Sequence, residues 1–309
     1  MSYVIVSDSS SNVFALAGTN YTTVPMKVMG SKEYVDTPEM NLAEMVEDLK
    51  TFKGKSGSSC PNVQEWIDAF GDADEIYCVT ISRNLSGSYN SAKQAVDAYL
   101  EEHPEKKAYV FDSFSAGPEQ AMIVDKIAES VAAGCDFETV IEKVEAYQNN
   151  THILFCLESL TNLARNGRVN PAVAKIAGVL GIRVIGDAQN GQIIPAHKVR
   201  GHKKAMQTIV EMMEDHGFYD GALIRVAACY AEAQANDLKA LVLEKWPNTR
   251  FVIEHTTALC SYYAEAGGLM IGIEGGFNAN NNPLCSSKNF CRPGLSRAAF
   301  SCIAQIRLI

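Results

Sequence analysis

Short β-branched runs alternate with amphipathic helical segments over the first half of the 309-residue chain, and this alternation restricts the possible folds most. The strand-like runs are Tyr3–Ser7, Glu75–Ser82 and Ala108–Asp112, and helical patterns follow the last two, at about 87–102 and 118–133. Strands separated by helices predict βαβ units and a largely parallel sheet. In such a sheet, ligands bind beyond the carboxyl ends of the strands.

The pattern changes after residue 150. A strand-like run at Ile153–Leu157 is followed by two runs that flank Asn190-Gly191, a hairpin turn signature, and then by a strand–helix–strand succession. This order indicates a sheet with helices on one face. We therefore expect an α/β protein with a Rossmann-like parallel-sheet domain in residues 1–150 and an α+β domain in residues 151–276.

The last residues, 277–309, form an atypical tail, because they contain four basic residues and no acidic one while the whole chain has a net charge of −9. An acidic chain without a basic stripe is a poor candidate for nucleic-acid binding. No stretch reaches 18 uninterrupted apolar residues, so no membrane span is expected. The first residues lack the features of a signal peptide, so we expect a cytoplasmic protein.

The nine cysteines form no CxxC pair and no cysteine–histidine spacing suited to zinc. Cys78, Cys156 and Cys229 fall inside apolar runs, which is typical of buried free thiols. We therefore predict neither a metal nor another cofactor.

Four polar clusters lie at predicted strand–helix junctions, where an open α/β sheet brings loops to one edge. They are Ser7–Ser11, Ser56–Ser59, Ser82–Ser88 and Asp112–Ser115. Each cluster alone is typical of a helix cap or a turn. Together their hydroxyls and N–H groups favour a site for a small anion, held without a metal. Asp8 is expected to orient hydroxyls or to cap, and Ser9 and Ser113 to belong to the supporting loops.

The third cluster carries a specific resemblance. The segment Ile81–Ala92, ISRNLSGSYNSA, closely resembles the signature of the DegV family, bacterial fatty acid-binding proteins. Other segments resemble further parts of that family in the same order, namely Val6–Ser11, Val110–Ala116, Leu160–Val169 and Ile194–Ala205. The resemblance covers about residues 1–275 and leaves the tail outside.

The resemblance implies a two-domain carrier that is not itself an enzyme. One long-chain fatty acid would lie in a tunnel between the domains, with its carboxylate toward the polar clusters. By position, the family's carboxylate-binding residues correspond to Ser58, with Ser59 beside it, and to Ser86. Gly87 would allow close backbone approach. Apolar residues such as those in Ile176–Ile185 are candidates for the tunnel wall, although core packing is an alternative role for them.

The resemblance also implies a partner. Family members that serve a fatty acid kinase present the acyl head to a dihydroxyacetone-kinase-like protein, which makes an acyl phosphate for phospholipid synthesis. Arg168 and Arg200 match basic positions that support head-group or partner contacts there. A solvated charge or an ion pair is the alternative reading of both.

The chain departs from the family pattern at two positions. Tyr263 stands where many members have a histidine near the head group, and Cys60 replaces a common glutamine. Tyr263 can donate a phenolic hydrogen bond to the carboxylate or act only as a packing aromatic.

Two other functions stay open on the sequence. Leu85-Ser86-Gly87 follows a strand and opens a helix, as in a serine-dependent acyl hydrolase, although the glycine two residues before the serine is missing. Alternatively, the chain is a regulatory module in which lipid is a structural filler.

Overall fold

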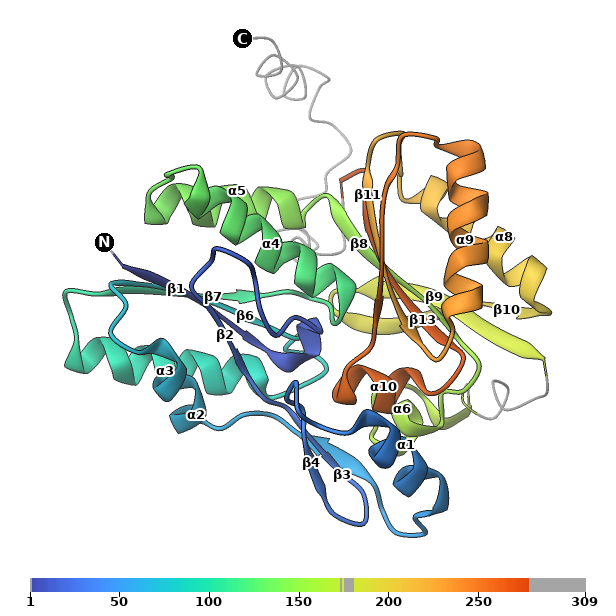
Figure 1. The fold of residues 1–309 in the computed structure, drawn as a ribbon, viewed down its shortest axis with the longest axis horizontal. Coiled ribbons are helices and arrows are strands. Elements are labelled where there is room, and N and C mark those ends of the chain that lie inside the picture. The colour runs from blue at the N-terminus through green and yellow to red at the C-terminus, as the bar shows by residue number, and fades with distance from the viewer. Residues whose placement is uncertain (1, 173, 175–180, 278–309) are drawn as a thin grey trace, which may run out of the picture.

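The computed structural model describes residues 2–172, 174 and 181–277. Two sheets lie next to each other, with helices around them (Figure 1). The first has the strand order β2-β1-β6-β7 and the second the order β10-β9-β8-β13-β11-β12. Among the described residues, no helix is long and apolar enough to cross a membrane.

The first sheet is parallel throughout, as the alternation of strands and helices predicts. Residues that alternate along its strands enter two separate cores, so helices pack on both faces. One face packs against α2 and α3, the other against α4 and α5. The strands are β1 (Tyr3–Asp8), β2 (Tyr21–Val24), β6 (Glu75–Thr80) and β7 (Lys107–Asp112), and the helices are α2 (Val63–Phe70), α3 (Ser88–Glu102), α4 (Pro118–Ala132) and α5 (Phe137–Gln148).

The second sheet is mixed, and its helices α8 and α9 share one core with the strands. The elements are β8 (Thr151–Leu157), β9 (Ile182–Gln189), β10 (Gln192–Arg200), α8 (His202–Asp215), β11 (Leu223–Cys229), α9 (Glu232–Lys245), β12 (Arg250–His255) and β13 (Gly268–Glu274). The predicted α/β class, with a parallel sheet followed by a second sheet of α+β type, is therefore confirmed. The domain division at residue 150 stays a prediction.

Helix α4 is shared by the two sheets, which Figure 1 shows as a helix between them. It contacts β1 and β6 on one side and β8, β11 and β13 on the other. A Cβ atom at Gly272 would lie 2.8 Å from the backbone nitrogen of Glu119, so the glycine permits this close packing. The sequence predicts the helix but not its second contact surface.

The hairpin β9–β10 turns at Asn190 and Gly191, which both have positive φ, as the turn signature predicts. Its tip reaches the first sheet. The Ser82 hydroxyl donates to the carbonyl of Gly191 at 2.8 Å, and the Asn84 amide donates to that of Asn190 at 2.6 Å. This contact joins the hairpin of the second sheet to the loop after β6.

A third, antiparallel sheet lies near the carboxyl ends of the first strands. It consists of β3 (Lys27–Met29), β4 (Glu33–Val35) and β5 (Gly57–Ser59). Two sequence-based interpretations are wrong here. The composition of Val24–Met29 favours one strand, but the run is split at Pro25, whose missing N–H cannot join a strand ladder. The Gly-, Lys- and Ser-rich stretch Thr51–Cys60 favours a loop, but it contains β5.

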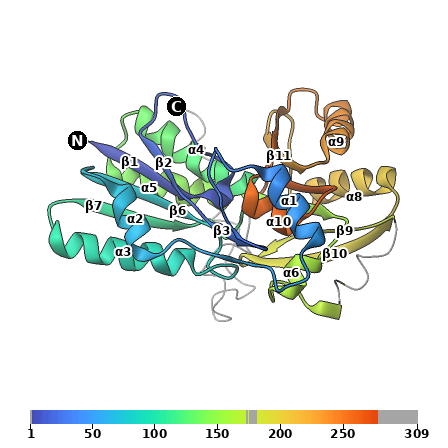
Figure 2. The ribbon, with the colours of Figure 1, turned by 60° about the horizontal axis from the view of Figure 1, so that its bottom comes forward.

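Short elements complete the fold around this small sheet. They are η1 (Ser9–Ser11), α1 (Leu42–Thr51), α6 (Thr161–Arg165) and α10 (Ala258–Ala264). Figure 2 shows α1, α6 and α10 gathered together, and the hydrophobic core beneath them joins Met26, Val28, Met45 and Tyr262.

Other predictions have mixed outcomes. Cys78, Cys156 and Cys229 are buried free thiols, as expected. The sequence also favours a short helix near Pro171–Leu180, but most of it, the tunnel-wall candidates at 176–180 and the tail beyond Phe277 lie outside the described residues. Of the other tunnel-wall candidates, Val184 and Ile185 pack in the hydrophobic cores, which was their alternative role.

Candidate functional site

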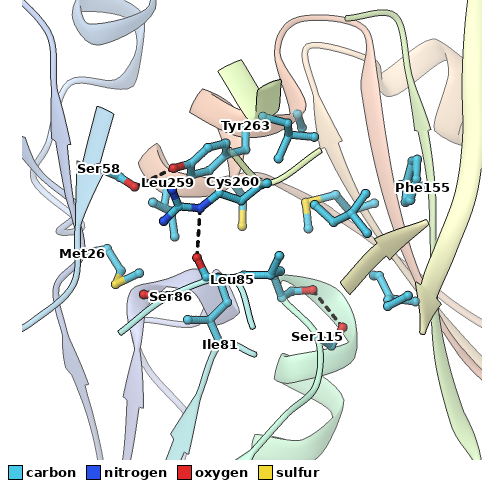
Figure 3. A pocket seen from close by; sticks show the side chains of 18 of the residues that line it. Met26, Ser58, Ile81, Leu85, Ser86, Ser115, Phe155, Leu259, Cys260 and Tyr263 are labelled. Atoms are coloured by element: carbon cyan, nitrogen blue, oxygen red, sulfur yellow. Dashed lines mark hydrogen bonds between the residues drawn. The ribbon is translucent and has the colours of Figure 1, made fainter. Parts of the chain in front are cut away.

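A cavity of about 310 Å³ lies where β5, the loops after β6 and β7, the inner face of the second sheet and α10 meet. This volume is at the lower end of the range for small-molecule pockets. Figure 3 shows Ser58, Ser86 and Tyr263 near one end and Phe155 at the other. The cavity therefore has most of its hydroxyls at one end and a mainly apolar wall, in which Ser115 and Asp187 are the other polar residues.

The apolar wall follows the two-residue period of strand β8. Ile153, Phe155 and Leu157 line the cavity, whereas Leu154 and Cys156 enter the core on the opposite face of the sheet. Other elements add the remaining apolar lining residues, which are Met26, Ile81, Leu85, Phe114, Ala116, Leu163, Ala188, Ile193, Leu259, Ala264 and Met270.

Two hydroxyls from different parts of the chain meet at the polar end. The Ser58 hydroxyl on β5 lies 2.7 Å from the phenolic oxygen of Tyr263 on α10. Burial raises the pKa of Tyr263, although the bond to Ser58 opposes the shift, so the phenol stays protonated. The two groups share one hydrogen bond and hold two protons, so one proton remains to donate to an anion.

The neighbouring residue on α10, Tyr262, makes three further hydrogen bonds that hold the helix. The hydroxyl of Tyr262 lies 2.9 Å from that of Ser56 and accepts a hydrogen bond of 2.9 Å from the Asn166 amide. Its carbonyl accepts a 2.8 Å bond from the amide of Asn162. These contacts join α10 to β5 and to α6.

Ser86 lines the cavity in the loop before α3, beside Gly87. Its oxygen accepts a bond of 3.3 Å from the backbone nitrogen of Ser88, and its hydroxyl also lies beside the Cys60 thiol. A Cβ atom at Gly87 would lie 3.3 Å from the sulfur of Cys60, so the backbone passes close to that side chain. Ser59 also lines the cavity, and burial raises the pKa of the Cys60 thiol, which therefore stays neutral.

The Asp8 side chain holds the loop between β6 and α3 through hydrogen bonds to both of its ends. Its buried carboxylate accepts hydrogen bonds from the backbone nitrogen of Ile81 at 2.9 Å and from the Ser88 hydroxyl at 2.6 Å. The Ser10 hydroxyl and the Gln120 amide donate to its other oxygen. Burial raises the pKa of Asp8, and the four hydrogen bonds oppose that shift. Asp8 therefore orients the loop that carries Ser86 and does not itself line the cavity.

Ser9 and Ser113 are also fully buried and outside the cavity lining. The Ser9 hydroxyl donates to Asp36 at 2.9 Å and accepts from the backbone nitrogen of Met26 at 3.0 Å. The Ser113 hydroxyl donates to the carbonyl of Ser115 at 3.0 Å. The polar clusters therefore do meet, but the first lies outside the cavity lining, and of the fourth only Phe114 and Ser115 line the cavity.

The two arginines predicted to contact the head group or a partner, Arg168 and Arg200, lie in different parts of the structure. Arg168 lines the cavity, and its guanidinium donates to the carbonyls of Leu85, at 3.0 Å, and of Asn166. Within the described part of the chain, no carboxylate lies within ion-pair distance of it. Arg200 is exposed at the far end of β10, roughly 20 Å along the strand from the cavity residue Ile193.

The arrangement suits an amphipathic anion. Neutral hydroxyls and one cation can pair with a negative head group, and the long apolar wall can cover a hydrocarbon. None of the chain's six histidines lines the cavity, so Ser86 has no imidazole base beside it. No group of three or more potential metal ligands occurs among the residues that the structure describes.

Comparison with known proteins shows which family the chain belongs to. The family model described as "Uncharacterised protein, DegV family" matches residues 2–274. The chain belongs to the DegV family. A DegV domain-containing protein of Streptococcus gordonii is 36% identical over 280 residues, which cover 89% of this chain and 99% of that protein.

Solved structures of DegV proteins share the fold. A family member from Eubacterium eligens, loaded with heptadecanoic acid, has a TM-score of 0.86 and 36% identity over 89% of this chain and all of that one. The Streptococcus pneumoniae Fatty Acid Kinase (Fak) B3 protein, loaded with linoleic acid, has a TM-score of 0.87 and 34% identity over the same shares.

Sequence reasoning on this DegV chain missed most of the cavity wall. The alternation along β8 was a usable signal, because a strand with two buried faces presents every second residue to each side. Leu259 and Cys260 had no such signal, since α10 is short and was not expected. Asp36 was missed as well, although it is buried and holds the start of α10.

Proposed function

We propose that this protein is a carrier that binds one long-chain fatty acid in the cavity, without catalysing a reaction itself. The carboxylate pairs with the Ser58–Tyr263 hydroxyls, Ser86 and Arg168, with Ser59 and Gly87 beside it. One observation carries the proposal, which is the gathering of these donors at one end of a cavity whose remaining lining is mainly apolar, with Ser115 and Asp187 as its other polar residues. The relatives from Eubacterium eligens and Streptococcus pneumoniae, loaded with fatty acids, support it.

The energetics agree with this orientation. Each buried methylene contributes ~0.8 kcal/mol, so a chain of about 14 methylenes gains on the order of 11 kcal/mol before association and ordering costs are subtracted. A carboxylate placed among the apolar residues of β8 would lose its hydration without any donor in return. The acid therefore enters with its polar head at the Ser58 end.

We further propose that the carrier presents the fatty acid to a fatty acid kinase. The name of the Streptococcus pneumoniae relative supports this partner class. Arg200 suits a role in the contact with the kinase better than one in the cavity, because it is exposed and distant from the lining residues. Loss of kinase binding in Arg200→Ala, with unchanged lipid binding, is the expected result of a pull-down. A kinase that binds the variant equally well would remove Arg200 from this role.

The binding proposal is tested by solvent extraction of the purified protein and mass spectrometry, followed by titration with a fluorescent fatty acid. We expect about one long-chain acid per chain and a tenfold or larger loss of affinity in Ser86→Ala, because a hydrogen bond to a charged group is lost. Ser91→Ala is the matched control, since Ser91 lies in the first turn of α3 and outside the cavity. No extracted acid and no uptake would reject the proposal.

A further inference from the structure

Asp36 caps a helix that is far away in the sequence. This buried residue follows β4, and its two carboxylate oxygens accept hydrogen bonds from the backbone nitrogens of Ala258, at 2.8 Å, and of Leu259, at 3.1 Å. These are the first two N–H groups of α10, whose own N-cap residue Thr257 makes no capping bond. The Thr257 hydroxyl instead lies within hydrogen-bond distance of the Asp36 carboxylate, at 3.1 Å, and of the Asn12 amide oxygen, at 3.0 Å.

The same carboxylate is tied to the opposite wall of the cavity. The Ser9 hydroxyl donates a hydrogen bond to Asp36 and accepts one from the backbone nitrogen of Met26, so it bridges the two residues. The backbone nitrogen of Asp36 donates to the Met26 carbonyl at 2.9 Å. Met26 and the α10 residues Leu259 and Tyr263 all line the cavity, so Asp36 connects two of its walls.

A short helix needs such a cap. Isolated helices of α10's length, seven residues, are unstable in water, and unpaired N–H groups at their first turn add to the cost. Tyr263 lies near the C-terminal end of α10, so its position follows that of the whole helix. The 2.7 Å contact with Ser58 tolerates little displacement before the hydrogen bond is lost.

We propose that Asp36 is a positioning residue for fatty acid binding, which holds α10 so that the Tyr263 hydroxyl stays within reach of Ser58 and of the carboxylate. This inference rests on the proposed function. Burial raises the pKa of Asp36, while the donors from Leu259, Ala258, Ser9 and Thr257 lower it. Asn at this position would turn an amide NH₂ toward a backbone N–H or a hydroxyl donor, so the cap would be incomplete.

A double-mutant cycle distinguishes positioning from a general structural role. Asp36→Asn is expected to weaken binding of cis-parinaric acid about fivefold in the wild-type background and in Ser86→Ala, but less than twofold in Tyr263→Phe. In the last background, the group that Asp36 positions is already absent. An equal loss in all three backgrounds overturns the proposal.

Thr257→Val provides a second variant in case Asp36→Asn does not fold. It removes the hydroxyl that Asp36 and Asn12 share and keeps the shape of the side chain, so we expect about a twofold loss that also disappears in Tyr263→Phe. An unchanged affinity, or a loss that persists without the phenol, contradicts the positioning role. Failure of the wild-type protein to bind cis-parinaric acid would instead reject the proposed function.

Discussion

The phenolic oxygen of Tyr263 lies 2.7 Å from the hydroxyl oxygen of Ser58, and this contact joins α10 to β5 across the polar end of the cavity. Neither group carries a charge, and Arg168 is the cation at this end. The site therefore offers neutral donors and one arginine to a negative head group.

The shared hydrogen bond predicts that Ser58 and Tyr263 partly replace each other. Tyr263→Phe frees the Ser58 proton for the ligand, so we expect only about a fivefold loss of affinity, ~1 kcal/mol. Removing both hydroxyls in Ser58→Ala/Tyr263→Phe should cost about fiftyfold. Fluorescence titration measures both values. Two single losses that simply multiply to give the double loss would contradict the sharing.

The charge of Arg168 predicts a salt effect. Arg168→Gln removes the cation, so we expect about tenfold weaker binding at low ionic strength and less dependence of the affinity on salt. Arg200→Gln is the matched control, because this arginine is exposed and outside the cavity lining. Titrations at two salt concentrations compare them. Equal effects of the two substitutions would show that Arg168 acts only through the net charge of the protein.

The alternation of side chains along β10 allows a steric test of the position of the acyl chain in the cavity. Ile193 lines the cavity, whereas its neighbour Ile194 does not. Ile193→Trp should fill the space and weaken binding of an 18-carbon acid at least tenfold, with a smaller effect on an 8-carbon acid. Ile194→Trp should leave both affinities nearly unchanged. A similar loss in both variants would place the hydrocarbon elsewhere.

The buried Glu119 predicts a pH dependence of stability. Burial raises its pKa to about 7, against the opposing hydrogen bonds of Ser115 and Thr151. Between pH 4.5 and 7 the folded state then binds more protons than the unfolded state, so Glu119 makes the free energy of unfolding fall as the pH rises.

Glu119→Gln removes this contribution. We expect the variant to match the wild type near pH 5 and to be more stable by a few kcal/mol at pH 8. Urea unfolding at both pH values measures the difference in free energy of unfolding between variant and wild type. Burial lowers the pKa of His152 to about 4, which has the opposite effect on stability, but this contribution is the same in both proteins and cancels in the difference. A constant difference at the two pH values would show that Glu119 is ionised throughout.

Local patterns predict the elements that are long and regular. Strand β8 and the hairpin at Asn190-Gly191 follow from β-branched runs and from a turn that needs positive φ. Short elements cannot be predicted from local patterns in the same way. Strand β5 has only three residues, Gly57–Ser59, and it exists because β3 pairs with it, which nothing in its own sequence indicates.

The candidate site is predictable to the same limited degree. Ser58 and Ser86 were expected from the family resemblance, and the structure places both on the cavity. Asp36 was not, because its role depends on a helix more than 200 residues later in the chain. The second contact surface of α4 was hidden for the same reason, since long-range packing leaves no periodic signal.

A crystal structure of the purified protein with added fatty acid tests the central claim most directly. We predict one elongated ligand, with its carboxylate within hydrogen-bond distance of Ser86 and of the Ser58–Tyr263 pair and its chain along Ile153, Phe155 and Leu157. A ligand in the reverse orientation, or one bound outside this cavity, would contradict the account.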